Sequence, residues 1–327
     1  MLQAHDLAER IRAGERRALA RAITLVESTR DEHRAVAVDV LEHLGAPGDT
    51  LRLGITGVPG AGKSTFIEAF GMRLIEAGHR VAVLSIDPTS AISGGSILGD
   101  KTRMEQLSRH PSAYIRPSPA GRTLGGVARR TRETLALCEA AGFDIVIIET
   151  VGVGQSETAV ASMTDMFLLL LVPGGGDDLQ GIKRGIVELA DLVLVNKADG
   201  ELVNAARRAA ADYANAFGLI RPRSQHWRTR VAVCSSLHGD GVSEAWDTVY
   251  EYWTTLKAAG ELAGNRARQA RANLWDEVAE TLLAHLRADP AHARRLAEFE
   301  DAVQSGVLSP SVAAERLVAE FRAAAAT

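Results

Sequence analysis

A nine-residue segment of the chain has the pattern of a phosphate-binding loop. It reads Gly57-Val58-Pro59-Gly60-Ala61-Gly62-Lys63-Ser64-Thr65 and fits G-x-x-x-x-G-K-[ST]. An apolar run over residues 51–56 precedes it and a segment of helical composition, 66–77, follows it, which is the strand–loop–helix context that the pattern requires. Glycines allow main-chain N–H groups to converge on an anion at the start of a helix. The segment therefore predicts a site for a nucleoside triphosphate.

Individual residues of this loop have different expected roles. Lys63 would reach the β- and γ-phosphates, and the Ser64 hydroxyl would ligate Mg²⁺. A glycine-rich turn without a ligand is the alternative, but strand, loop, Lys-Ser pair and helix all agree with phosphate binding. The candidate nucleotide-binding residues of the loop are Gly57, Gly60, Ala61, Gly62, Lys63, Ser64 and Thr65.

A second motif, far downstream, predicts which base is bound. Asn196-Lys197-Ala198-Asp199 follows the apolar run 191–195 and has the pattern N-K-x-D. An aspartate carboxylate can accept hydrogen bonds from N1–H and from the exocyclic amino group of guanine, and a site built for both donors rejects a base that lacks them. A third segment follows the run 230–234 and is expected to present N–H groups to the guanine O6. GTP is therefore the expected substrate and GDP the product, with base-binding residues Asn196, Lys197, Asp199, Ser235, Ser236 and Leu237.

Charged residues at the ends of other apolar runs suggest a magnesium site. Mg²⁺ prefers one or two carboxylates together with phosphate and water oxygens. Glu149 follows the apolar run 145–148 and is the best candidate for holding the metal or its water, followed by Asp100 and then Asp87. A carboxylate in such a place can instead cap the next helix. With Ser64, these three residues form the expected metal-binding set.

Hydrolysis of GTP requires positioning and charge stabilisation rather than a covalent step. Gln155 could orient the attacking water and Lys183 could neutralise charge in the transition state, although a loop residue of either type is commonly just solvated. Lys63 and Glu149 complete the candidate catalytic set. Clusters of glycine beside these residues indicate segments that a γ-phosphate and its Mg²⁺ would order and that hydrolysis would release.

The composition is that of an ordinary globular protein. The chain has 327 residues, 46% of them hydrophobic and 24% charged, with a formal net charge of −4. Nothing in this balance suggests a nucleic-acid partner. Cys138 and Cys234 lie in apolar surroundings and are expected in the core. No apolar run approaches the roughly 18 residues that a membrane span needs, and the first residues lack a secretory layout. We therefore expect no membrane association and a cytoplasmic location.

The order of apolar segments predicts an α/β fold. Residues 5–45 have helical periodicity, and strand candidates at 51–56, 81–86, 144–149, 166–172, 191–195 and 230–234 alternate with helical segments. Most of these runs are continuously apolar, as expected for parallel strands covered on both faces. The expected fold is a doubly wound, mostly parallel sheet of the P-loop GTPase type, with ligands at the carboxyl ends of the strands. Three parts are expected: N-terminal helices (1–48), the GTPase domain (49–241) and a C-terminal helical extension (242–327).

The C-terminal extension carries apolar stripes at helical spacing. Val242, Trp246, Val249, Trp253 and Leu256 repeat at three or four residues, and a second stripe begins at Leu274. Such stripes can simply pack on the domain, or they can form a dimer arm, and two tryptophans on one stripe slightly favour an interface. The sequence leaves both possibilities open.

Taken together, these motifs resemble one family, the methylmalonyl-CoA mutase-associated GTPases (MeaB/MMAA type), whose older label is arginine/ornithine transport kinase (ArgK). The resemblance covers nearly the whole chain, and it is carried by the phosphate loop and by the segments Asp87–Met104, Ile147–Glu157, Asp178–Lys183 and Asn196–Asp199. One departure is Asp178, where Glu is commoner in the family. That change keeps the charge.

The resemblance implies a function that periodicity cannot show. Proteins of this family are homodimers that pair with help from their C-terminal helices. They chaperone an adenosylcobalamin-dependent acyl-CoA mutase, with GTP hydrolysis as the timing step of cofactor loading and protection. The resemblance also implies that Asp100 and Glu149 are magnesium-site positions and that Asp177–Lys183 is a switch that touches the mutase.

Two other functions remain as alternatives. A transport-linked kinase would need a catalytic base and an acceptor pocket, and the sequence contains neither an H-R-D nor a D-F-G arrangement. A nickel-type metallochaperone GTPase would need a His- or Cys-rich tract, whereas the nine histidines of this chain are scattered.

Overall fold

The computed structural model describes residues 2–46, 48–86, 104–118, 124–150, 156–174, 184–288 and 290–324. The chain forms two compact units, Met1–Gln269 and Ala270–Thr327. The first unit contains the sheet and both nucleotide-binding motifs, and the second consists of helices.

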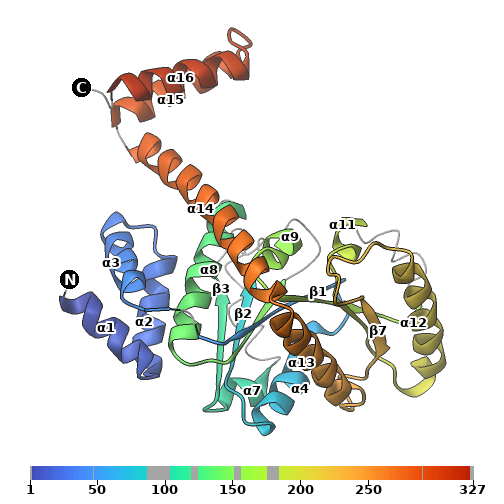
Figure 1. Ribbon diagram of the computed structural model, residues 1–327. Helices are drawn as coiled ribbons and strands as arrows, with labels where there is room; N and C mark the ends of the chain where they lie inside the picture. The colour runs from blue at the N-terminus through green and yellow to red at the C-terminus, as the bar shows by residue number, and fades with distance from the viewer. Residues whose placement is uncertain are drawn as a thin grey trace. The chain divides into compact units, whose positions relative to one another are not determined.

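A parallel sheet is the centre of the first unit (Figure 1). Within the described part of the chain it has seven strands in the order β3-β2-β4-β1-β5-β6-β7, all parallel, so the doubly wound α/β prediction is confirmed. The central strand β1 lies between β4 and β5, whose carboxyl ends therefore flank the phosphate loop. The strands are β1 (Leu51–Gly57), β2 (Val81–Ile86), β3 (Ala113–Ser118), β4 (Ile145–Thr150), β5 (Met166–Leu171), β6 (Leu192–Val195) and β7 (Arg230–Val233).

Six of these strands match the apolar runs of the sequence to within one residue at either end. The apolar pattern does not predict β3, because Arg116 and Pro117 interrupt it. The strand lies at the edge of the sheet and pairs with β2 alone. Proline is tolerated at such an edge because the missing N–H faces away from the only neighbouring strand.

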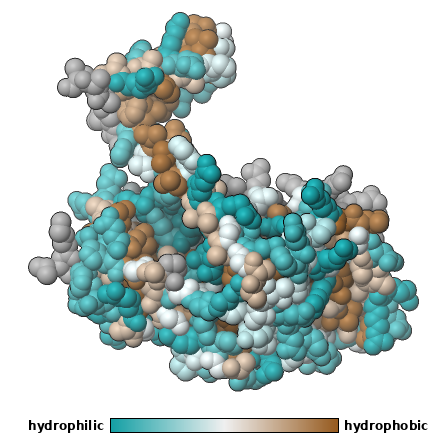
Figure 2. Space-filling model, viewed as in Figure 1, coloured by the Kyte–Doolittle hydropathy of each residue, from teal (hydrophilic) through white to brown (hydrophobic). Residues whose placement is uncertain are grey.

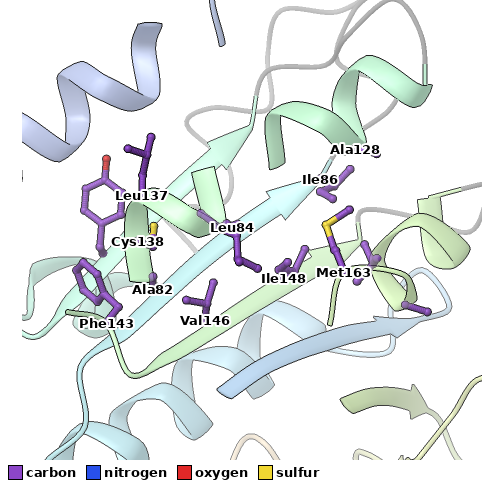
Figure 3. Packing of buried hydrophobic residues seen from close by; sticks show 14 of the residues in the cluster. Ala82, Leu84, Ile86, Ala128, Leu137, Cys138, Phe143, Val146, Ile148 and Met163 are labelled. Carbon is purple, nitrogen blue, oxygen red and sulfur yellow. The ribbon is translucent and has the colours of Figure 1, made fainter. Parts of the chain in front are cut away.

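Alternate residues of the strands belong to two apolar cores. On one face, Ala82, Leu84 and Ile86 of β2 and Val146 and Ile148 of β4 pack with α8 (Leu124–Ala140), as Figure 3 shows. On the other face, the intervening strand residues pack with α4 (Lys63–Glu76) and α13 (Val242–Ala258). This two-sided cover explains the continuously apolar strands. Cys138 and Cys234 are both buried and unpaired, as predicted.

Three N-terminal helices confirm the helical prediction for residues 5–45. They are α1 (Leu2–Arg12), α2 (Arg16–Glu27) and α3 (Asp31–Glu42). Their apolar faces join the core that contains α8. Arg34 donates to Glu133 of α8 at 2.5 Å, and Arg116 of β3 pairs with Glu27. The N-terminal helices are thus part of the same compact unit as the sheet.

Shorter helices connect the strands, and longer ones follow the sheet. The connecting elements are α7 (Glu105–Arg109), α9 (Ser156–Ala161), α11 (Arg184–Val187), the 3₁₀ turn η1 (Gly200–Leu202) and α12 (Val203–Gly218). After α13 come α14 (Glu261–Ala288), α15 (Pro290–Gln304) and α16 (Pro310–Ala324).

The first apolar stripe of the C-terminal extension packs on the domain. Val242, Val249 and Leu256 of α13 are buried in the core under the sheet, and Trp246 and Trp253 pack against the same core while partly exposed. The boundary between the two compact units lies inside α14, after Gln269. The tryptophan stripe is therefore explained by packing within the first unit.

The second unit has a small core of its own. Leu286, Phe299, Ala313 and Leu317 are buried together. By contrast, five apolar side chains on α14 are between 38% and 65% exposed, namely Leu274, Trp275, Val278, Leu282 and Leu283. Figure 2 shows hydrophobic surface over this helix. The second stripe of the sequence is thus largely left out of the core of the second unit.

One buried carboxylate gives the fold a pH-dependent stability term. Asp191 directly precedes β6, and its Oδ2 accepts a hydrogen bond from the Phe167 N–H at 2.9 Å. Burial raises the pKa of Asp191 from 3.8 to about 6, although Arg223, 3.7 Å away, opposes the shift. Because the folded pKa exceeds the unfolded one, this group favours folding most below about pH 4 and loses that contribution as the pH rises through 6.

Replacing Asp191 with Asn should therefore remove this contribution to the pH dependence of the free energy of unfolding. The amide oxygen can still accept from Phe167, but it does not titrate. Relative to wild type, the free energy of unfolding of Asp191→Asn should rise between pH 4 and pH 7 by on the order of 3 kcal/mol, from a shift of about two pKa units. Urea unfolding across this range measures the difference, with the exposed Asp247→Asn as control. Parallel profiles for wild type and Asp191→Asn would contradict the assignment.

Candidate nucleotide-binding site

The phosphate loop joins β1 to α4 with the backbone geometry that the sequence predicts. Gly60 and Gly62 have φ values of 79° and 87°, in the left-handed region that favours glycine. A Cβ on Gly57 would lie 2.3 Å from the Leu170 carbonyl oxygen of the neighbouring β5. Glycine at 57 therefore permits the close approach of two strands where the loop begins, and the loop ends at the N-terminus of α4, where N–H groups are available to an anion.

Lys63 is held inside this loop. Its ammonium Nζ donates to the Gly57 carbonyl at 2.8 Å, and the residue is only 9% exposed. Burial lowers the pKa of Lys63, while the negative charges of Glu149 and Glu157 act in the opposite direction. A cation with little water around it, close to converging N–H groups, is well placed to interact with a bound phosphate.

Ser64, the residue after Lys63, lies beside Glu149 of β4. The Ser64 Oγ lies 3.5 Å from the Glu149 Oε1, and Glu149 is 3% exposed at the end of β4. Mg²⁺ binds oxygens at about 2.1 Å in octahedral geometry, which places adjacent ligand oxygens about 3 Å apart. A hydroxyl and a carboxylate at this separation therefore fit a magnesium ion after a small adjustment. Glu149 reaches this place because its strand lies beside β1.

The other predicted metal and catalytic residues lie outside the described residues. This applies to Asp87, Asp100, Gln155 and Lys183. Their roles stay predictions from the sequence.

Asn196 joins the phosphate loop to the third motif. It follows β6, is 2% exposed, and its Nδ2 donates to the Ala61 carbonyl of the phosphate loop at 2.8 Å. Its Oδ1 accepts from the Ser236 N–H at 3.0 Å and from the Ser236 hydroxyl at 2.8 Å. A Cβ on Gly62 would lie 2.7 Å from this Nδ2, so the contact also requires glycine there. In this structure the side chain of Asn196 therefore holds two loops together.

Asp199 is oriented by Ser235. The Ser235 Oγ donates to the Asp199 Oδ2 at 2.6 Å, and Asp199 remains partly exposed. Two other residues of the predicted base-binding set are exposed, namely Lys197, with a positive φ of 58°, and Leu237, at 73%. A partly exposed carboxylate held in place by one hydroxyl can still accept hydrogen bonds from a ligand, as a base-binding group must.

The tertiary structure thus brings two sets of predicted residues to the carboxyl edge of the sheet. One contains Lys63, Ser64 and Glu149, and the other contains Asn196, Asp199, Ser235 and Ser236. The sequence motifs do not single out Glu157, which is 1% exposed in the first turn of α9 and whose charge acts on Lys63. Nor do they predict the buried contact between the Thr56 and Thr150 hydroxyls at 2.7 Å. These residues are far apart in the sequence and become neighbours only through the pairing of the strands, so no sequence motif relates them.

Comparison with known proteins identifies the family. A family model described as "Methylmalonyl Co-A mutase-associated GTPase MeaB" matches residues 19–291. The chain belongs to this family. This confirms the resemblance seen in the sequence, and the MeaB-family chain is a P-loop GTPase.

Relatives and a solved structure agree with this assignment. The MeaB-family chain is 51% identical over 321 residues to "Methylmalonic aciduria type A homolog, mitochondrial" of Mus musculus, covering 94% of this chain and 77% of the relative. It is 47% identical over 321 residues to "GTPase ArgK" of Escherichia coli, covering 97% of each. A solved structure described as "Crystal structure of LAO/AO transport system kinase" matches with a TM-score of 0.76 and 39% identity over 98% of both chains.

None of the helices in the described parts of this MeaB-family chain combines the length and the apolar character that a membrane crossing would require.

Replacing Asn196 should weaken nucleotide binding without changing the choice of base. Asn196→Ala removes the bonds to Ala61 and Ser236 but leaves Asp199 and Ser235 in place. We expect GTP and GDP affinity to fall by about tenfold or more, because buried amide groups lose their partners. Calorimetry with guanosine and xanthosine diphosphates measures both effects. An unchanged GDP affinity would contradict the linking role.

Replacing Asp199 should instead change the choice of base. In Asp199→Asn the amide cannot accept from both guanine donors, so guanosine affinity should fall tenfold or more while xanthosine affinity rises. The same calorimetric titrations provide the comparison, and Asn196→Ala is the matched control for a general loss of binding. A variant with the wild-type preference for guanosine over xanthosine would contradict the base-reading role of Asp199.

Proposed function

We propose that GTP hydrolysis by this protein is a conformational signal to an adenosylcobalamin-dependent acyl-CoA mutase, gating the loading of its cofactor and protecting it from inactivation. The observation that carries the proposal is the family match over residues 19–291, whose description names association with methylmalonyl-CoA mutase. The mouse relative, named for a methylmalonic aciduria, supports the same partner class. We further propose that the protein acts in the cytoplasm.

The described residues support a hydrolytic mechanism that relies on positioning. The loop N–H groups before α4 would bind the phosphates, and Lys63 would exchange its bond to the Gly57 carbonyl for one to a β- or γ-phosphate oxygen. Ser64 and Glu149 would hold Mg²⁺, which when bound neutralises charge across the phosphates. Asp87 and Asp100 are proposed as further groups of the magnesium site.

We assign the remaining catalytic roles as proposals from the sequence. Gln155 orients the attacking water, and Lys183 stabilises charge that develops on the transferred phosphoryl group. Catalysis by placed charges alone makes turnover sensitive to anything that moves these residues, including contact with the mutase.

A contact next to the phosphate loop supports transmission of the signal. Glu68 of α4 accepts hydrogen bonds from the N–H groups of Gln106, at 2.7 Å, and Leu107 at the start of α7. Leu107 fills a notch at Gly71, where a Cβ would lie 2.7 Å from the leucine side chain. Since α4 begins at Lys63, a shift of this helix on nucleotide exchange would move α7 with it.

We also propose that the protein is a homodimer formed through its C-terminal helical extension. The support is the run of exposed apolar side chains on α14, from Leu274 to Leu283. Contiguous apolar surface of this kind is uncommon on a monomer and typical of an interface.

Two alternative functions can be tested directly. The matching solved structure is described as a transport system kinase, so phosphate release from GTP without any acceptor would separate hydrolysis from phosphoryl transfer to a substrate. A nickel metallochaperone would retain stoichiometric nickel or zinc after purification, so the absence of both in a metal analysis would exclude this function. No grouping of three or more metal-binding side chains occurs within the described ranges.

The mutase proposal is tested by capture from native lysate. Wild-type protein loaded with a non-hydrolysable GTP analogue is expected to retain a cobalamin-dependent mutase subunit, identified by mass spectrometry. Lys63→Ala should lose GTP turnover by at least a hundredfold, because the buried cation beside the phosphates is removed, and it should lose nucleotide-dependent capture. The exposed Arg208→Ala serves as control. GTP turnover without any captured mutase would contradict the proposed partner but would still support the GTPase activity.

A further inference from the structure

A small cavity lies at the opposite end of β6 from the guanine-binding residues. It has a volume of about 130 Å³ and is bounded by the end of α12, the start of β7 and the loop between them. Asp191, just before β6, lines it, whereas Asn196 and Asp199 follow the same strand. Four residues of parallel strand span roughly 13 Å, so this cavity is separate from the nucleotide site. Figure 1 shows α12 and β7 beside each other at one end of the sheet.

Three arginines line the cavity. Arg223 donates to the Leu189 carbonyl at 2.8 Å and lies 3.7 Å from the Asp191 carboxylate. Arg221 and Arg228 are exposed, and neither pairs with an acidic side chain in the portion of the chain that the structure describes. Two guanidinium groups are therefore available to an occupant of the cavity.

The charges around the cavity favour an anion. The acidic residues of the lining are Asp191, which is buried and paired with Arg223, and Glu188, whose side chain is exposed. Asp191 does not neutralise Arg221 and Arg228, because its carboxylate already interacts with Arg223 and the Phe167 N–H. With Glu188 counted, three arginines face two carboxylates, so the lining has a net charge of +1.

The loop that carries Arg228 is anchored on both sides of it. Trp227 is 6% exposed, and its Nε1 donates to the Asp191 carbonyl at 3.0 Å. The Thr229 hydroxyl donates to the Ala190 carbonyl at 2.7 Å. The Arg230 guanidinium stacks 4.3 Å from the Trp227 ring centre and pairs with Glu251 at 2.7 Å. Because the backbone is held at these residues, the ordering cost of binding an anion at Arg228 is limited to the arginine side chain.

We propose that this cavity binds a phosphoryl dianion between Arg221 and Arg228, either free orthophosphate or the phosphate group of a small phosphomonoester. The planar guanidinium fork matches the oxygens of phosphate and can bind them through two parallel hydrogen bonds. A cavity of 130 Å³ can hold several waters, because one water needs roughly 10–15 Å³ on this measure. It admits one tetrahedral anion but no nucleotide, for which pockets of at least about 300 Å³ are usual.

Calorimetry on the full-length protein tests this site. The protein is first saturated with Mg²⁺ and GDP so that the phosphate loop is filled, and is then titrated with orthophosphate, sulfate and glycerol 2-phosphate at constant ionic strength. We expect saturable binding at one site. The double variant Arg221→Gln/Arg228→Gln should bind at least tenfold more weakly, since two charge-assisted contacts are lost. Stronger binding of the ester than of orthophosphate assigns the phosphomonoester as occupant, and the reverse assigns the free ion.

A matched control separates a built site from general surface charge. Arg207→Gln/Arg208→Gln changes two exposed arginines on α12 that do not line the cavity and alters the net charge equally. This variant should retain wild-type affinity. Equal weakening in both double variants, or no saturable binding to wild type, would overturn the proposal. Circular dichroism and GDP affinity test whether each variant is folded. Neither measurement involves a mutase, so a failure of the anion site can be distinguished from a failure of the proposed function.

Discussion

The buried amide of Asn196 is the contact on which the nucleotide site depends. It donates to the phosphate loop at Ala61 and accepts twice from Ser236, so one side chain connects the element expected to bind the phosphates with the element expected to meet the base. At 2% exposure, neither end of the amide can be satisfied by bulk water if a partner moves. The distance between the two halves of the site is therefore set by protein contacts.

The parallel sheet makes this arrangement possible. Because all strands run the same way, the phosphate loop after β1, Glu149 at the end of β4 and Asn196 after β6 reach one edge. The order of strands places β4 directly against β1, which brings a carboxylate to Ser64. Burial on both faces keeps the strands rigid, so the charges at their ends are held in place before a ligand binds.

The amino-terminal ends of β6 and β7 have a different electrostatic character from their carboxyl ends. There, Asp191 is kept among apolar groups with Arg223 beside it, and further arginines surround a small cavity. Strand β6 joins this edge to the guanine motif through Leu192–Val195, all of them buried. The two ends of one strand thus carry the residues predicted to bind the base and the arginines proposed to bind a small anion.

The sequence by itself determined the fold class, six of the strands, the phosphate loop and the family, because continuous apolar runs, glycine spacing and long polar motifs are local properties. It also selected Lys63, Ser64, Glu149 and Asp199. Only the tertiary structure decided that Asn196 binds protein groups at both ends of its amide, that Arg116 and Pro117 lie in an edge strand, and that the tryptophans of α13 pack on the domain. These outcomes depend on which distant segments become neighbours, and strand order and burial, rather than residue spacing, decide that.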